Sequence, residues 1–323
     1  AYSFLVTDFD AADLNDESTP SQIATTALGL LMQGKDATSA VQMLAARQQE
    51  DGTFSGPTTE VTGYSWAILS LLAAKENGIE ADFDLDKAVQ AIAAAAKEDG
   101  GYNDWGEEGN VDTTGMVMMG LAAAGTDAAD EALKSAAAFL ASTMQEDGYF
   151  VGQGEYDSAN SCSQAFGIIG LICAGEDLSA GKWSKSIDAL LRCQDENGGF
   201  WYQETPSDFF PAPDAMSTYQ AILALQDLSD GSNFFVDMTK EPLSKPTENS
   251  SAASMISTPS SASSSASEQS SATSIPETGD EGISPVVWAL LGVAVLVLIV
   301  LCIIPIVNKK KKGNAFKNIF YQY

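Results

Sequence analysis

Gln49-Glu50-Asp51-Gly52-Thr53-Phe54 is the first of four similar segments in the sequence. Each combines acidic residues with a glycine and a closing aromatic residue, and the other three are Lys97–Tyr102, Gln145–Phe150 and Gln194–Phe200. Their turn glycines stand at 52, 100, 148 and 198, so the chain repeats every 48 to 50 residues. Asp-Gly and Asn-Gly favour the left-handed conformation that ends a helix. We therefore predict a tight turn after each of four helices, with its aromatic ring packed beneath a neighbouring helix.

The segment before each turn has the pattern of an amphipathic helix. Apolar residues recur there three and four positions apart, at Val41, Leu44 and Ala45, then Val89, Ile92 and Ala96, then Leu133, Ala136 and Leu140, then Ile187, Leu190 and Leu191. This spacing places them on one face of a helix. Each such helix is expected to cover a core with one side and face solvent with the other.

A second kind of helix is predicted from segments that are apolar on every side. These segments are residues 24–30, 65–71, 114–121, 166–171 and 218–225. A helix without a polar face is buried on all sides. The alternation predicts an all-α fold, an (α/α) toroid with an inner ring of buried helices and an outer ring of amphipathic ones. About five inner and four outer helices are visible. Because a closed ring has six pairs, and because the chain begins at Ala1 without a signal peptide, we expect an incomplete toroid and a fragment that lacks N-terminal repeats.

These repeated turns between paired helices resemble those of the terpene cyclase/prenyltransferase superfamily, the squalene-cyclase-type toroids. The likeness covers Ser21 to Leu228, and we expect residues 1–20 to be a lead-in and residues 21–235 to be the toroid domain. The complement thioester domain and the cobalamin carriers share this barrel. One departure is that Phe or Tyr stands where cyclases usually carry Trp.

The sequence contains no complete catalytic motif of the families that it resembles. Cyclases use an Asp-x-Asp-Asp acid, and the nearest segment here, residues 82–86 (Asp-Phe-Asp-Leu-Asp), falls where Asp caps an outer helix. The chain has no histidine, which excludes the zinc site of protein prenyltransferases and every Ser-His-Asp mechanism. The thioester sequence Cys-Gly-Glu-Gln is absent as well. Asp112 and Asp157 remain as candidates for a catalytic acid.

The loops before the inner helices are expected to meet at one end of the barrel and form its mouth. They carry aromatic residues beside carboxylates and amides, a combination that suits a glycan, a peptide or a corrinoid. The candidate ligand-binding residues are Glu60, Tyr64, Trp66, Asp104, Trp105, Tyr156, Asp157, Asn160, Trp201, Tyr202 and Phe210. Two alternatives stay open: Asp104, Glu107 and Asp112 as calcium ligands, or aromatic side chains that merely pack the mouth while Asp112 and Asp214 cap inner helices.

Three cysteines lie in the predicted toroid, at 162, 173 and 193, and their spacing matches no metal motif. One interpretation is that all three are buried thiols. The other is a disulfide between Cys162, at the start of an inner helix, and Cys193, at the end of the next outer helix, because antiparallel packing brings those ends together.

The charge of the chain restricts its partners. With 44 acidic and 16 basic residues the formal net charge is −28. Such a surface repels nucleic acid phosphates and anionic lipid headgroups, so neither is an expected partner.

The C-terminal part of the sequence predicts an anchor. Residues 236–274 become rich in Ser, Ala, Thr and Pro and are expected to be a disordered linker. Residues 275–312 then hold Ile-Pro-Glu-Thr-Gly, an apolar run at 286–307 long enough to cross a bilayer, and four lysines at 309–312, which favour a cytoplasmic end. Residues 313–323 would be a cytoplasmic tail.

The pentapeptide at 275–279 resembles the LPXTG sorting signal of Gram-positive surface proteins. The resemblance implies that a sortase cleaves between Thr278 and Gly279 and joins the threonine to a cell-wall or pilin amine. A single-pass membrane anchor that is never cleaved is the alternative. In both cases we expect the toroid outside the cell, as a surface-displayed binding or adhesion module. The alternative functions are a noncanonical toroid enzyme acting on an isoprenoid or lipid, and a structural spacer.

Overall fold

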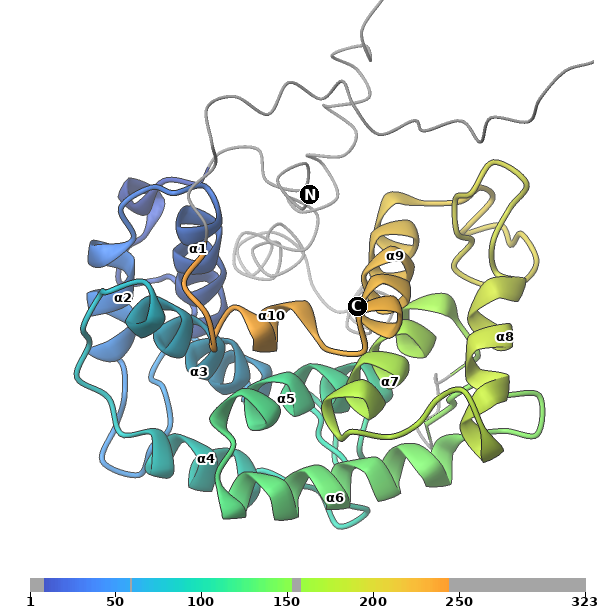
Figure 1. Cartoon of the computed structure of the whole chain (residues 1–323), viewed down its shortest axis with the longest axis horizontal. Coiled ribbons are helices and arrows are strands. Elements are labelled where there is room, and N and C mark those ends of the chain that lie inside the picture. The colour runs from blue at the N-terminus through green and yellow to red at the C-terminus, as the bar shows by residue number, and fades with distance from the viewer. Residues whose placement is uncertain (1–8, 59, 153–157, 244–323) are drawn as a thin grey trace, which may run out of the picture.

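The computed structural model describes residues 9–58, 60–152 and 158–243, and within these ranges the protein is all-helical, with isolated β-bridges but no strand. Five helices line the inner side of an arc (Figure 1): α1 (Pro20–Met32), α3 (Val61–Glu76), α5 (Val111–Ala124), α7 (Ser161–Cys173) and α9 (Ala215–Asp230). Four helices form its outer side: α2 (Thr38–Ala45), α4 (Leu85–Ala94), α6 (Asp127–Thr143) and α8 (Ser184–Arg192). The short elements are η2 (Ala11–Asp13), η3 (Gly181–Trp183) and α10 (Phe234–Asp237).

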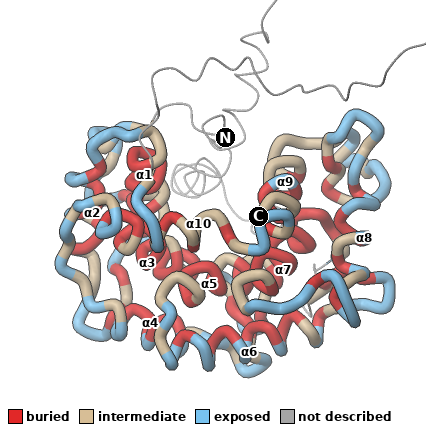
Figure 2. Tube along the Cα trace, viewed as in Figure 1, coloured by how far each residue is buried: buried red, intermediate tan, exposed pale blue. Residues whose placement is uncertain are grey.

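The two kinds of helix differ in burial as the sequence predicts. Almost every residue in the middle of the inner helices α3, α5 and α7 is buried, whereas the outer helices bury one face (Figure 2). Each inner helix packs against the next one in the chain, and α1 and α9 stand at the two ends of the arc (Figure 1). The prediction of an all-helical arrangement with inner and outer layers is confirmed for the described residues.

The four repeated turns have the predicted geometry. Gly52, Gly100, Gly148 and Gly198 all have φ between 86° and 97°, a conformation that residues with a side chain rarely adopt. The aromatic residues that follow are 2% exposed or less, namely Phe54, Tyr102, Phe150 and Phe200. An Asp side chain holds each turn by accepting backbone N–H groups, as Asp195 does from Asn197 and Gly199 at 2.9 and 2.8 Å. Each turn thus locks an outer helix to the inner helix that follows.

Neighbouring inner helices meet at glycine. A Cβ atom on Gly115 of α5 would lie 2.2 Å from the Phe166 carbonyl oxygen of α7, and one on Gly120 would lie 2.4 Å from Ser65 Oγ of α3. Ser65 Oγ uses this proximity, since it accepts the Gly120 N–H at 3.0 Å and donates to the Met116 carbonyl at 2.7 Å. Glycine therefore permits backbone-to-backbone contact on both sides of α5.

The folded part extends beyond the predicted toroid boundaries, 21 and 235, at both ends. The Phe9 ring packs on α1, where a Cβ on Gly29 would lie 2.1 Å from it. At the other end, Val236 and Met238 are 5% and 3% exposed and belong to the core. Periodicity misses both segments because each is too short to show it.

The predicted anchor lies outside the described residues. This applies to all but the first eight residues of the linker at 236–274, to the sorting signal at 275–312 and to the tail at 313–323. Of the helices in the described ranges, none combines the length and apolar character needed to span a bilayer.

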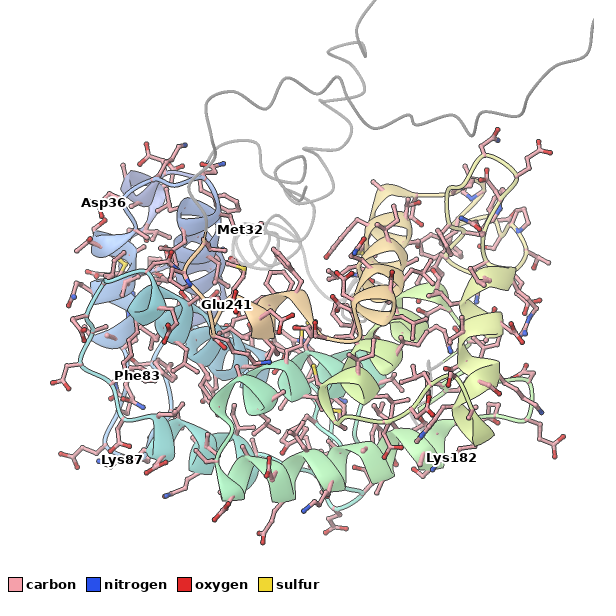
Figure 3. The ribbon with its side chains drawn as sticks, in the orientation of Figure 1. Met32, Asp36, Phe83, Lys87, Lys182 and Glu241 are labelled. Atoms are coloured by element: carbon pink, nitrogen blue, oxygen red, sulfur yellow. The ribbon has the colours of Figure 1, made fainter. Side chains whose placement is uncertain are left out.

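Residues 232–243 form a segment that we call the strap. It begins after Gly231, which ends α9 with φ +70°, and contains α10. In Figure 1 α10 lies on the concave side of the arc between α1 and α9, and it packs on α5. Figure 3 shows Met32 of α1 and Glu241 of the strap on this concave side, while Lys87 lies on the outer side of the arc.

Candidate functional site

The first turns of the inner helices lie side by side along one rim of the arc, which we call the N-terminal edge. Side chains connect them in sequence: Asp104, in the loop before α5, binds Thr62 at the start of α3, and Asp112 of α5 binds Ser163 of α7. The next contact joins Cys162 of α7 to Ser217 of α9, with 3.7 Å between sulfur and oxygen. Loops 103–110 and 201–214, which precede α5 and α9, complete this edge. The prediction that these loops meet at one end agrees with these contacts.

Asp104 caps a helix other than its own. Its Oδ2 accepts the Thr62 hydroxyl at 2.6 Å and its Oδ1 accepts the Thr62 N–H at 3.2 Å, while Glu60, the N-cap residue of α3, makes no capping hydrogen bond. A carboxylate placed there satisfies free N–H groups and interacts favourably with the helix dipole. Burial nevertheless raises the pKa of Asp104, against the opposing effect of the Thr62 hydrogen bonds.

Glu60 lies close to Asp104 and shares its electrostatic environment. Its Oε1 accepts the Thr58 hydroxyl at 2.9 Å. Burial raises the pKa of Glu60, the Thr58 bond opposes this, and the Asp104 charge raises the pKa further. The two acids make this part of the edge favourable for a hydroxyl or cationic group that could donate to them.

The next acid along the edge, Asp112, has a different role from the predicted cap. Asn110 caps α5 by accepting the Thr113 N–H at 3.0 Å. Asp112 Oδ2 instead accepts the Ser163 hydroxyl of α7 at 2.9 Å. Asn160, another predicted site residue, caps α7 through the Ser163 N–H at 2.8 Å. Both side chains are thus engaged within the protein.

Asp214 is a cap, as predicted. It accepts both the N–H and the hydroxyl of Ser217, at 2.8 and 2.6 Å, at the start of α9.

The predicted aromatic residues divide into exposed and buried sets. The Trp105 side chain is 61% exposed and Trp201 is partly exposed. Phe209, in the same loop as Phe210, is 79% exposed. Tyr202 is 3% exposed and stacks on Phe210 with 4.2 Å between ring centroids. Stacking inside the loop leaves the outward-facing rings at the edge as the available binding surface.

Two further aromatic residues of the predicted mouth, Tyr64 and Trp66, pack against other aromatic rings. Tyr64 is 4% exposed and packs on Phe54 in the core, with 6.2 Å between centroids. Trp66 faces the strap, with its ring 5.1 Å from that of Phe235 in an edge-to-face arrangement. Tyr64 points towards the first repeated turn, where its hydroxyl interacts with Thr53 and with the charges of Asp51 and Asp104, whereas Trp66 points to the concave side. Tyr156, Asp157, Thr278 and Gly279 lie outside the described residues.

The predicted Cys162–Cys193 disulfide is not formed in this structure, where Cys162, Cys173 and Cys193 are free. The reason is that the two thiols have different partners: Cys162 lies beside Ser217, whereas Cys193 lies 3.1 Å from the Tyr149 hydroxyl. Burial raises the pKa of both thiols, so they are neutral. A neutral, buried thiol is a poor nucleophile.

The calcium hypothesis for Asp104, Glu107 and Asp112 finds no support in the geometry. Asp104 binds α3 and Asp112 binds α7, and the described residues contain no group of three acidic or cysteine side chains that could hold a metal ion. Asp84, from the cyclase-like segment at 82–86, caps α4 by accepting the Lys87 N–H at 3.0 Å. It thereby acts as the predicted cap on the outer side of the arc.

Sequence reasoning missed the polar group at the opposite end of α9. Asp227 is 1% exposed, and burial raises its pKa to about 6. It accepts hydrogen bonds from two strap residues, Asn233 and Phe234. The sequence around the strap residues that bind Asp227 does contain a local pattern, since Asn233 lies shortly after a helix-ending glycine and before two aromatic residues. This pattern occurs once, so periodicity does not reveal it.

A groove of about 530 Å³ lies elsewhere, on the outer wall between α6 and residues 173–183. Its lining includes Lys134, Ala137, Ala141 and Trp183. It is distant in the topology from the N-terminal edge and contains none of the predicted site residues.

The arc of paired helices and its connected N-terminal edge define the protein as an α/α repeat domain of the terpene cyclase type. Residues 56–228 match the sequence model of the squalene-hopene cyclase C-terminal domain. This match covers more than half of the chain, and the protein belongs to that family.

Comparison with solved structures finds similar but distant folds. One is ent-copalyl diphosphate synthase from Streptomyces platensis, with 20% identity and a TM-score of 0.43 over 71% of this chain and 50% of that chain. The present chain thus spans about half the length of that synthase. Another is a variant of UGL with dGlcA-Glc-Rha-Glc, with 16% identity and a TM-score of 0.46 over 67% of this chain and 74% of that chain. A search of the curated proteins gave no match.

Proposed function

We propose that the protein is a binding module displayed on the bacterial surface, with the N-terminal edge as its ligand-binding surface. The observation that carries the proposal is the pair of exposed aromatic rings at this edge, Trp105 at 61% and Phe209 at 79% exposure. Exposed aromatic side chains beside carboxylates are typical of sites that bind sugars, since the ring packs on the apolar face and the acids accept hydroxyls. A glycan is therefore the proposed ligand class.

The loop that carries Trp105 is held in a fixed shape. Asn103 accepts the Trp105 N–H at 3.0 Å and donates to the Glu108 carbonyl at 2.7 Å. Asp99 accepts the N–H groups of Gly101 and Gly109, so both ends of the loop are attached to one side chain. A preorganised loop loses little entropy on binding, which favours a recognition role.

The direction in which the chain leaves the domain agrees with this proposal. The last described residue, Leu243, donates its N–H to Asn77 Oδ1 at the C-terminal end of α3. This is the end opposite to Thr62 and the N-terminal edge. A chain anchored through residues beyond 243 would hold the binding surface away from its attachment point.

Binding to glycan arrays by the purified chain tests the proposal, with a peptide library and cobalamin as competing ligand classes. We expect saturable glycan binding that Trp105→Ala weakens by at least about tenfold. Phe83→Ala, on the connection to the outer helix α4, serves as the matched aromatic control. Equal binding by Trp105→Ala and the unchanged chain would exclude this edge, and the absence of any ligand would favour the spacer alternative.

We also propose that a sortase attaches the chain to the cell wall or to a pilin amine. The support is the order of the Ile275–Gly279 pentapeptide, the apolar run at 286–307 and the lysines at 309–312. Incubation with sortase and a glycine-based amine should give a product that ends at Thr278, seen by mass spectrometry. Retention of residues 279–323 in membranes of sortase-positive cells would instead favour the uncleaved anchor.

A second candidate function is a noncanonical enzyme that acts on an isoprenoid or lipid. Membership of the cyclase family favours it, together with Asp112, whose carboxylate lies between the starts of α5 and α7. Turnover of such a substrate that is abolished in Asp112→Asn or Asp157→Asn, with glycan binding absent, would establish this alternative.

A further inference from the structure

The strap covers the concave side of the arc and is attached at three places. At its start, Asp227 Oδ2 accepts Asn233 Nδ2 at 2.6 Å and Asp227 Oδ1 accepts the Phe234 N–H at 3.0 Å. In its middle, Phe235 packs edge-to-face on Trp66. At its end, the Leu243 N–H donates to Asn77 Oδ1 at 3.0 Å.

These attachments differ in strength. The first buries a carboxylate that is 1% exposed and fully used by strap donors. The second adds the buried side chains Val236 and Met238 to the aromatic pair. The last combines one hydrogen bond, from the Leu243 N–H to Asn77, with a Leu243 side chain that is only partly buried against the core, and water can replace that hydrogen bond. The strap is therefore held most weakly where the chain leaves the domain.

The order of the attachments decides how the strap responds to a pulling force. Every force that reaches the domain from residues beyond 243 passes first through Leu243. The Asn77 bond, the Trp66 contact and the Asp227 bonds then bear the load one after another, because the strap is a single chain. A segment that is pulled from one end is peeled off, so its contacts break one after another. Peeling requires a lower force than breaking all the contacts at the same time.

We propose that the strap is a releasable cover, which opens from Leu243 towards Gly231 when the C-terminal chain is under tension and exposes the concave face around Trp66. Gly231 is the hinge, since its positive φ already turns the chain back at the end of α9. The inference rests on the proposed function in one respect, namely that an anchored, ligand-bound surface protein experiences tension at this end. Release removes the core contacts of Val236 and Met238, but the repeated turns and the glycine contacts that join the inner and outer helices do not involve the strap, so we expect these helices to remain folded.

Single-molecule pulling on the full chain, through its N-terminus and its residues beyond 243, tests this proposal. We expect a reversible extension step before the helices unfold. The 12 residues from 232 to 243 limit the step to roughly 40 Å, the length of a fully extended segment of that size. A single event in which strap and helices unfold together would overturn the proposal.

Matched variants assign the step to the strap. Phe235→Ala removes the ring that packs on Trp66 and should shorten the lifetime of the closed state at constant force by about tenfold. Phe83→Ala removes a ring on the outer side of the arc, outside both the strap and the N-terminal edge, and should leave that lifetime unchanged. Equal lifetimes in the Phe235 variant and the unchanged chain would contradict the proposed contact.

The outcome is separable from that of the proposed function. The pulling experiment uses neither a glycan nor a sortase, so a missing ligand leaves the predicted step in place. Conversely, a chain that binds its glycan but shows no early step would retain the binding module and exclude the releasable strap.

Discussion

The two rims of the arc, at the N-terminal and C-terminal ends of the inner helices, are stabilised in different ways. At the N-terminal edge four similar turns recur, each with a glycine of positive φ and a buried ring, and side chains such as Asp104 and Asp112 link neighbouring inner helices. At the opposite rim positive-φ glycines also recur after the inner helices, at 34, 78, 125, 175 and 231, but the connections that follow them differ in length, and one strap crosses the concave side. The comparison indicates that contacts repeated from one helix pair to the next hold the N-terminal edge, whereas the strap is held by contacts that occur once.

The largest effect is expected from removing a ring of the repeated turns. Phe150 is fully buried, and a Cβ on Gly167 of α7 would lie 2.4 Å from its ring. Phe150→Ala should lower the free energy of unfolding by about 4 kcal/mol, because the lost contacts leave a cavity. Urea denaturation measures this change. Phe209→Ala, which removes an exposed ring, is the control, and equal losses in both variants would contradict the role assigned to the turn.

A smaller loss is expected from the glycine of the same turn. Gly148 has φ +97°, and a Cβ there would lie 2.3 Å from the Lys185 carbonyl oxygen of α8. Gly198 has φ +87° with no atom within 4 Å of such a Cβ. We expect Gly148→Ala to cost about 3 kcal/mol, from strain and a clash, and Gly198→Ala only about 1 kcal/mol, from strain. If thermal denaturation gave equal losses of stability for the two variants, the close contact between Gly148 and α8 would be unimportant.

At the strap, the effect of pH on Asp227 sharpens the comparison. Its pKa of about 6 exceeds the ordinary value of 3.8, so the closed state takes up a proton. Stability from this group is complete below about pH 4 and is lost as pH rises through about 6. The surrounding charges are Asp230 on α9 and Asp237 on α10, both of which raise the pKa, and Lys240, which pairs with Asp237; the Cys173 thiol of α7 also faces the group.

Amide hydrogen exchange at Phe234 measures this dependence. After correction for intrinsic rates, we expect protection at pH 5 to exceed that at pH 7.5 by about tenfold. Asp227→Asn removes the titrating group and should abolish the difference. The Tyr102 N–H, which binds the Thr114 hydroxyl at the other end of the arc, provides the internal control. A variant that keeps the full pH dependence would assign it to another group.

The smallest effect on stability is expected at the proposed binding surface. Trp105→Ala should change the free energy of unfolding by less than about 0.5 kcal/mol, because the loop is held by Asn103 and Asp99 rather than by the indole. Thermal denaturation alongside the glycan assay checks this. A large destabilisation would mean that Trp105 is a structural residue and would weaken the proposal for this edge.

The repeated part of the fold could be predicted from sequence because its signals are local and occur several times. Gly52 and Phe54 belong to a pattern that three later segments repeat, and helices without a polar face have to be buried. The strap could not be predicted in this way. Its attachments to Trp66 and Asn77 join residues more than 160 positions apart, as with Asn77 and Leu243, and no periodicity encodes such a pair.

The candidate site was predictable only in part. Sequence order placed Asp104 and Asp112 at one end of the barrel, and the structure brings both to the N-terminal edge. The sequence does not show which aromatic rings face outwards. The exposure of Tyr64 and Trp66 depends on the rotation of α3 about its axis, and that of Trp105 depends on the shape of its loop. The sequence also could not show that Asp104 caps α3 rather than its own helix, because that contact depends on packing between repeats.

The glycine contacts of α5 have a consequence for the shape of the whole arc. Gly115 and Gly120 bring the backbone of α5 close to its two neighbours, with the small Ser65 side chain bridging α3 and α5, so these glycines limit how far apart successive repeats lie. A methyl group at either position would move the neighbouring helices apart and increase the radius of curvature. Two hydrogen atoms on α-carbons therefore help to determine how wide the concave surface is, and so what size of molecule can lie within it.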